Sequence, residues 1–132
     1  MDNRTGFGVV LTMVCVFTAL LSTDAGKTHT DFVTTTISNN KIAIFSKSYC
    51  PYCARTKNVF KELNVTPYVV ELDLRGDGGE IQNALSNLVG RRTVPQVFID
   101  GKHIGGSDDT VEAYQSGTLA KLLGITDEEE LR

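Results

Sequence analysis

Cys50 and Cys53 are the residues of this sequence whose type and spacing point most directly to chemistry. They are separated by two residues in the segment SKSYCPYC, residues 46–53. A structural zinc site needs four ligands, usually from two Cys or His pairs. Apart from this pair the chain has one cysteine, Cys15 inside an apolar run, and two histidines, His29 and His103. A permanent structural disulfide is disfavoured, because it would close too short a loop to restrict the unfolded chain. The spacing therefore favours a redox-active pair and no metal site.

The elements around the motif explain how such a pair would work. KIAIFS, residues 41–46, is an apolar run typical of a buried strand, and Pro51 suits the first turn of a helix. Cys50 would then lie where unpaired N–H groups and the helix dipole stabilise an anion, so we expect a lowered pKa, assisted by the charge of Lys47. Cys53, one turn further, is expected to be shielded. We predict that Cys50 attacks a disulfide and that Cys53 resolves the mixed disulfide.

The remaining segments predict one α/β domain. Two strands joined through a helix should be parallel, and a hairpin turned at Asp100-Gly101 should be antiparallel. We therefore expect a four-stranded mixed sheet with helices on both faces. The predicted elements are a helix over 31–38 capped near Thr30, a strand over 41–46, a helix over 51–63, a strand over 67–74, a helix over 78–90, the hairpin over 96–106, a helix capped by Ser107 or Asp108 that runs to about Ser116, and a last helical turn over 118–124, before an acidic tail.

The N-terminus has the pattern of a targeting segment. Residues 5–23 form an uncharged run that follows only Asp2 and Arg4, and the small residues Thr23 and Ala25 suit a cleavage site before the next residue. This is typical of a secretory signal peptide. The run also approaches the length that spans a membrane, so an uncleaved signal anchor is the alternative.

This pattern sets the expected domain organisation and location. We expect a signal peptide or signal anchor over residues 1–25 and the folded domain over residues 26–132. The protein would then lie in the endoplasmic reticulum or Golgi lumen, or be secreted, and would contact a membrane only through residues 5–23 if these are not cleaved. The formal net charge of −3 and pI of about 5.3 give no general attraction for nucleic acid, so we expect no such partner.

Two further segments could bind a peptide-like ligand. Cis peptide bonds occur almost only before proline, so Val94–Pro95 is either a cis bond that exposes the Val94 backbone or a trans proline that starts an edge strand. In GGSDD, residues 105–109, glycines lead into a helix N-terminus, which can bind a carboxylate. Asp108 could accept a hydrogen bond from a ligand ammonium. The alternative for this segment is a simple turn followed by a helix cap.

Together, KSYCPYC, TVPQVFIDGKHIGG and SDD resemble the dithiol (class I, CPYC-type) glutaredoxins of the thioredoxin-like fold. The similarity covers about residues 31–123. It implies reduction of protein–glutathione mixed disulfides and of small disulfides with glutathione as reductant, by a monomer whose protein substrates are glutathionylated or disulfide-containing. It implies that Cys50 is the nucleophile and Cys53 the resolving thiol.

The resemblance also implies a binding site for glutathione. Lys47 and Gln82 would face the glycine carboxylate, and Tyr52 would flank the tripeptide. The backbone of glutathione would pair with the segment Thr93, Val94 and Pro95, and its γ-glutamyl end would be held by Gly106, Ser107 and Asp108.

Two other functions compete with this interpretation. Some members of the family bridge a [2Fe–2S] cluster between two protomers, although these often lack a proline at the position of Pro51; a brown, dimeric protein on anaerobic purification would indicate that class. A thioredoxin-like or disulfide-isomerase-like oxidoreductase would act on proteins directly. Against it, the chain has no tryptophan, and Lys47 and the GGSDD segment have no clear purpose for a bare protein substrate.

Overall fold

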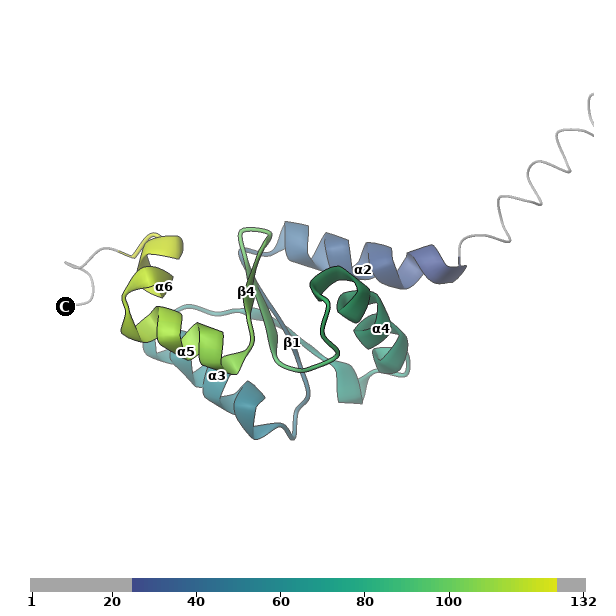
Figure 1. The fold of residues 1–132 in the computed structure, drawn as a ribbon, viewed down its shortest axis with the longest axis horizontal. Coiled ribbons are helices and arrows are strands. Elements are labelled where there is room, and N and C mark those ends of the chain that lie inside the picture. The colour runs from purple at the N-terminus through teal and green to yellow at the C-terminus, as the bar shows by residue number, and fades with distance from the viewer. Residues whose placement is uncertain (1–24, 126–132) are drawn as a thin grey trace, which may run out of the picture.

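The computed structural model describes residues 25–125, which form a four-stranded sheet between two layers of helices (Figure 1). The predicted signal segment before Ala25 and the acidic tail after Ile125 lie outside the described residues. In that described part, none of the helices is long and apolar enough to cross a membrane. The elements in chain order are α2 (Ala25–Asn39), β1 (Ile42–Ser46), α3 (Pro51–Glu62), β2 (Tyr68–Glu71), the 3₁₀ turn η1 (Leu72–Leu74), α4 (Gly78–Val89), β3 (Gln96–Ile99), β4 (Lys102–Gly105), α5 (Ser107–Gln115) and α6 (Thr118–Leu122).

The sheet confirms the predicted mixed topology. Its strand order is β2-β1-β3-β4, with β1 parallel to β2 and antiparallel to β3, and with β3 and β4 forming the antiparallel hairpin. Ser46, the last residue of β1, lies opposite Glu71 of β2, and its neighbour Phe45 lies opposite Gln96 of β3. The start of α3, the end of β2 and the start of β3 are therefore brought to one edge of the sheet.

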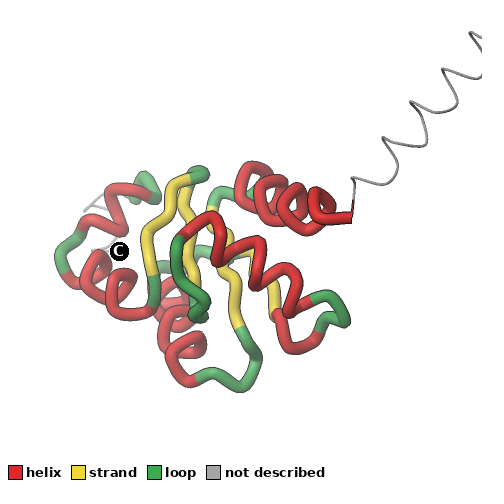
Figure 2. Tube along the Cα trace, turned by 45° about the vertical axis from the view of Figure 1, so that its right-hand side comes forward, coloured by secondary structure: helices red, strands yellow, loops and turns green. Residues whose placement is uncertain are grey.

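Helices cover both faces of the sheet (Figure 2). Alternate residues of the strands build a separate core on each face. Ala43 and Phe45 face the layer formed by α2 and α4, whereas Ile42 and Ile44 face α3 and α6. Successive side chains of a strand point to opposite faces, which is why the apolar run of β1 is buried on both sides. This packing holds α3 against the sheet through Val59 and Phe60.

Helix α2 is longer than the sequence predicts. It begins at Ala25 rather than near residue 31, so Thr30 lies inside the helix and is not its cap. The threonines that weaken the pattern are accommodated because their hydroxyls donate to carbonyls one turn earlier, for example Thr36 Oγ1 to Phe32 O at 2.7 Å. Val33 and Ile37 are buried against the sheet. Tertiary burial thus outweighs the local preference of β-branched residues for strands.

Strand β2 is shorter than predicted, because residues 72–74 turn into η1. Leu72 is buried in the core at that turn, and its carbonyl oxygen approaches Gly78 so closely that a Cβ there would lie 1.8 Å from it. Only glycine fits at that position. The turn also brings Asp73 toward the loop that precedes α3, where its carboxylate accepts from Ser48.

Candidate active site

Cys50 is the N-cap of α3. Its backbone is extended, with φ −82° and ψ 121°, and Pro51 follows in the first turn, as the sequence predicts. The backbone N–H of Cys53 donates to the Cys50 sulfur over 3.4 Å. The sulfur therefore takes the place of the oxygen with which a serine or aspartate cap satisfies the first N–H groups of a helix.

This position explains the acidity of Cys50. Partial burial would raise the pKa of its thiol, but hydrogen bonds from the Cys53 side chain and from the Cys53 and Tyr52 backbone N–H groups outweigh burial, and the Lys57 ammonium adds to them. The pKa of Cys50 is therefore lowered, in the direction that its place at a helix start predicts. Lys57 thus contributes a cation that the sequence did not indicate, and the contribution of Lys47 stays a prediction.

Cys53 lies on the inner side of the helix. Its side chain is fully buried, whereas that of Cys50 is partly accessible, and the two thiols are not bridged. Burial is the largest effect on Cys53 and raises the pKa of its thiol, although hydrogen bonds from the Lys47 backbone and from Ser46 oppose it. One accessible, acidic thiol and one shielded, less acidic thiol form the pair that the sequence predicts.

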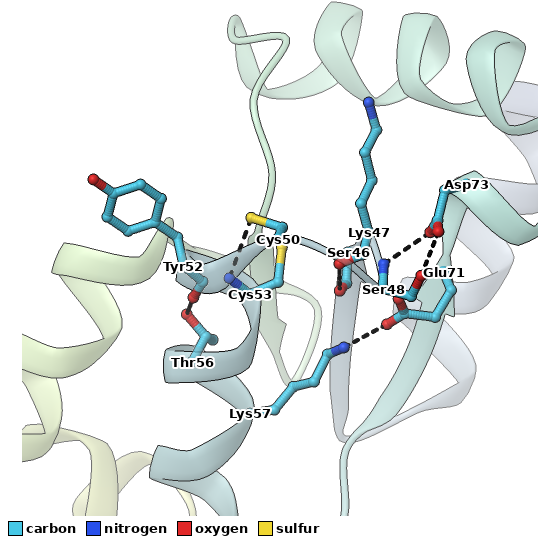
Figure 3. Close-up of polar contacts among 10 residues, drawn as sticks. All are labelled: Ser46, Lys47, Ser48, Cys50, Tyr52, Cys53, Thr56, Lys57, Glu71 and Asp73. Carbon is cyan, nitrogen blue, oxygen red and sulfur yellow. Dashed lines mark hydrogen bonds and ion pairs between the residues drawn. The ribbon is translucent and has the colours of Figure 1, made fainter.

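The loop before α3 is held by Asp73. Its carboxylate accepts hydrogen bonds from the Ser48 N–H at 2.8 Å and from the Ser48 hydroxyl (Figure 3). These bonds lower the pKa of Asp73, so the carboxylate stays ionised. At the other end of the loop, the Cys50 N–H donates to the Lys47 carbonyl at 3.1 Å. The backbone from Lys47 to Cys50 is thereby fixed at both ends.

The loop that carries Thr93, Val94 and Pro95 is locked by Gln96. The Val94–Pro95 bond is cis, which decides between the two sequence alternatives. The buried Gln96 side chain donates to the Thr93 carbonyl at 3.1 Å and to the Thr93 hydroxyl at 3.0 Å. Its Oε1 lies 2.6 Å from Nε2 of His103 on β4, and burial lowers the pKa of that imidazole. This network connects the loop to the hairpin.

The N-terminus of α5 lies beside the same loop. Gly106 is the N-cap, so the sequence expectation of Ser107 or Asp108 as cap is wrong. The cap shifts because the Asp109 carboxylate accepts from the Gly106 N–H at 3.0 Å and fills the space where a side chain of Gly105 would lie. Ser107 is left as the first helical residue. Its hydroxyl is buried and has no hydrogen-bond partner among the residues described.

A contact from Gly106 joins two of the predicted binding segments. A Cβ on Gly106 would lie 3.5 Å from the carbonyl oxygen of Pro95, so the cap of α5 adjoins the cis-proline loop. Asp108 projects into solvent, and its Oδ1 pairs with Arg55 Nη1 of α3 at 3.1 Å. The Asp108 carboxylate, which the resemblance assigns to a ligand ammonium, therefore forms an ion pair with Arg55 of the chain itself.

Three other predicted residues have different surroundings. Tyr52 is 61% exposed on α3, beside Cys50 (Figure 3). Gln82 is buried on α4. The Lys47 side chain extends away from the cysteine pair, on the side opposite Lys57. Cys50, Cys53 and Tyr52 therefore lie together at the start of α3, and the cis-proline loop adjoins the cap of α5.

Sequence reasoning missed several residues around the site. Lys57 could have been found from the sequence, because it follows Cys50 by seven residues, or about two turns of the predicted helix. Arg55 and Asp73 could not be identified from the sequence, because Asp108 and Ser48, their partners, are distant in the sequence. The role of Gln96 depends on its burial and on His103 of β4, which the sequence does not show. Over residues 25–125 there is no group of three or more His, Cys, Asp or Glu side chains that could hold a metal ion.

Comparisons with known proteins agree with this arrangement. A family model described as glutaredoxin matches residues 42–104. Glutaredoxin-C4 of Arabidopsis thaliana is 60% identical over 122 residues, covering 92% of this chain and 90% of the relative. Glutaredoxin-C8 of Oryza sativa subsp. japonica is 59% identical over 128 residues, covering 95% and 94%. The solved buckwheat glutaredoxin–glutathione complex superposes with a TM-score of 0.74 at 40% identity, over 77% of this chain and 93% of that chain.

Proposed function

This chain belongs to the glutaredoxin family, and on that basis we propose that it reduces protein–glutathione mixed disulfides and small disulfides with glutathione as the reductant. It is a thiol–disulfide oxidoreductase with a thioredoxin-like fold. The observation that carries the proposal is the position of Cys50, whose accessible sulfur caps α3 and receives the Cys53 N–H. A thiolate stabilised at that place is the nucleophile that disulfide exchange needs.

The first reaction needs only one thiol of the chain. The Cys50 thiolate attacks the glutathione sulfur of a mixed disulfide, which forms a Cys50–glutathione disulfide and releases the substrate as a thiolate that takes a proton from water. A second glutathione thiolate then attacks the glutathione sulfur on Cys50. Oxidised glutathione leaves, and the Cys50 thiolate is restored.

The second reaction needs both thiols. The Cys50 thiolate attacks one sulfur of a substrate disulfide and forms a mixed disulfide with it, while the S–S bond of the substrate breaks and its second sulfur leaves as a thiolate that takes a proton from water. The Cys53 thiolate then attacks the Cys50 sulfur, the substrate leaves as a thiolate, and a Cys50–Cys53 disulfide remains for glutathione to reduce. Burial raises the pKa of Cys53, so this thiol must lose its proton before it attacks the Cys50 sulfur.

The proposed glutathione site uses the two segments that meet beside Cys50. We assign the γ-glutamyl carboxylate to the N–H groups at the start of α5. The Ser107 hydroxyl at that place is buried and makes no hydrogen bond to the residues described. The Val94 backbone before the cis proline would pair with the cysteinyl residue, and Lys47 would meet the glycine carboxylate. The solved buckwheat relative is a complex with glutathione, which supports this choice of ligand.

The function is tested by turnover of a mixed disulfide between glutathione and a small thiol, with glutathione as the only reductant and glutathione reductase to follow oxidised glutathione. We expect the rate to saturate as the concentration of the mixed disulfide rises, because the protein binds the glutathione half of this substrate. A protein that ignores glutathione but accepts electrons from a thioredoxin reductase would contradict the proposal and favour the thioredoxin-like alternative.

The proposal extends to the protein's partners. We assign glutathionylated and disulfide-containing proteins as substrates, and a monomer as the active species. The support is that both thiols and both proposed binding segments come from a single chain, so that no second copy is required. Light scattering during chromatography should give the mass of one chain.

We also propose that the uncharged run over residues 5–23 directs the chain into the secretory pathway. The composition of that run supports the proposal, and the residues lie outside those that the structure describes. Fusing residues 1–30 to a fluorescent reporter should place the reporter in the endoplasmic reticulum or Golgi, or outside the cell. Cytosolic or plastid fluorescence would contradict the proposal, whereas a membrane-bound, full-length fusion would select the anchor over cleavage.

A further inference from the structure

Lys57 lies on the same side of α3 as the two cysteines. It follows Cys53 by four residues and Cys50 by seven, which correspond to about one and two turns of an α-helix. In Figure 3 its side chain runs beneath the cysteine pair toward the end of β2. Residues at this spacing share one face of the helix, so the ammonium lies on the side of α3 where the sulfurs lie.

The Lys57 ammonium is fixed by Glu71. Its Nζ lies 2.6 Å from Oε1 of Glu71, and the two side chains are only 32% and 19% exposed. A charge held in this partly enclosed position is screened less by salt and water than one on a mobile surface side chain. Such a charge can act on a neighbouring thiolate through the low-dielectric edge of the protein.

Glu71 in turn depends on Lys57. It sits at the end of β2 opposite Ser46, and its second oxygen, Oε2, is buried without a hydrogen-bond partner in the described part of the chain. The carboxylate is therefore compensated mainly through the oxygen that faces Lys57. Removing the lysine alone would leave an uncompensated, largely buried charge.

Lys47 has the opposite arrangement. Its backbone carbonyl accepts from the Cys50 N–H, but its side chain extends to the other side of the loop. The carboxylate on which its charge acts is that of Asp73, whose pKa it helps to lower. Two other carboxylates have partners of their own, because Asp73 accepts from Ser48 and Asp108 pairs with Arg55.

We propose that the Lys57 ammonium, held in place by Glu71, is the side-chain charge that stabilises the Cys50 thiolate, and that Lys57 is therefore a positioning residue for the exchange reaction. This inference deepens the proposed function and rests on Cys50 being the nucleophile. It separates two tasks that the sequence predicts for Lys47 alone. Lys57 acts on the thiolate, and Lys47 is left for the glycine carboxylate of glutathione.

The test is the pH profile of Cys50 alkylation by iodoacetamide, measured by mass spectrometry in a Cys53→Ser background without glutathione. In Lys57→Met we expect the midpoint to rise by about half a pH unit or more, since a neighbouring cation that favours the thiolate is lost. Lys57→Arg keeps the charge and should restore most of the shift. Lys61→Met, the same change one turn further along α3 at an exposed lysine, should leave the midpoint unchanged.

A second variant guards against loss of folding. In Lys57→Met/Glu71→Gln both charges of the pair are removed, so no buried carboxylate is left uncompensated, and the midpoint should still rise. A midpoint equal to that of the parent in this double variant would overturn the inference. So would a larger rise in Lys47→Met than in Lys57→Met.

The alkylation test is independent of the proposed function. A raised midpoint in a protein that fails to turn over glutathione mixed disulfides would leave the role of Lys57 intact and reject the function. Normal turnover of the parent with an unchanged midpoint in Lys57→Met/Glu71→Gln would do the reverse.

Discussion

Replacing Cys50 by serine is expected to abolish both reactions, on glutathione mixed disulfides and on protein disulfides. A serine hydroxyl is not ionised at neutral pH, so the nucleophile that attacks sulfur is lost. We expect activity below about 1% of the wild type, a loss of at least about 2.7 kcal/mol of transition-state stabilisation. Both substrates are assayed with glutathione as the only reductant.

The fold should tolerate this change. Serine is itself a preferred N-cap, so its oxygen can accept the Cys53 N–H in place of the sulfur. An unchanged melting temperature would therefore show that the loss is chemical. If Cys50→Ser retained substantial activity, Cys53 would have to be the attacking thiol, and the assignment of the two roles would be wrong.

Replacing Cys53 by serine is expected to separate the two reactions. Reduction of a glutathione mixed disulfide needs only Cys50, so this activity should be kept, and it should rise where formation of the Cys50–Cys53 disulfide competes with turnover. Reduction of a protein disulfide by the dithiol route needs Cys53 to displace the product, so we expect that activity to fall by about tenfold or more, equivalent to about 1.4 kcal/mol. The two substrates are assayed side by side.

The Cys53→Ser variant keeps the features that stabilise the Cys50 thiolate. The bond to the Cys50 sulfur comes from the backbone N–H of residue 53, which the substitution does not touch, and the serine hydroxyl can still donate. The alkylation midpoint of Cys50 should therefore stay close to that of the wild type. A variant that is dead on a simple glutathione mixed disulfide would reject the one-thiol route.

The local features of this protein could be predicted because they depend on neighbours in sequence. An apolar run followed by Cys50 and Pro51 is sufficient to predict a buried strand that leads into a capped helix, and this is what the structure contains. The Gly90 stop of α4 and the Asp100-Gly101 hairpin turn depend equally on backbone geometry that a few residues set. The failures occurred where burial competed with local preference, as in α2 and at the end of β2.

The sequence by itself therefore determined the thiol pair, its place at a helix start, the mixed sheet and the resemblance to the glutaredoxins, since each is encoded in short segments. Only the tertiary structure decided which side chains surround that pair. Glu71 binds Lys57, and Asp73 binds Ser48, because the sheet brings segments that are distant in the sequence to one edge. Electrostatic interactions depend on distance in space and on burial. For that reason Lys57, seven residues beyond Cys50 in the sequence, is among the groups that lower the pKa of this thiol.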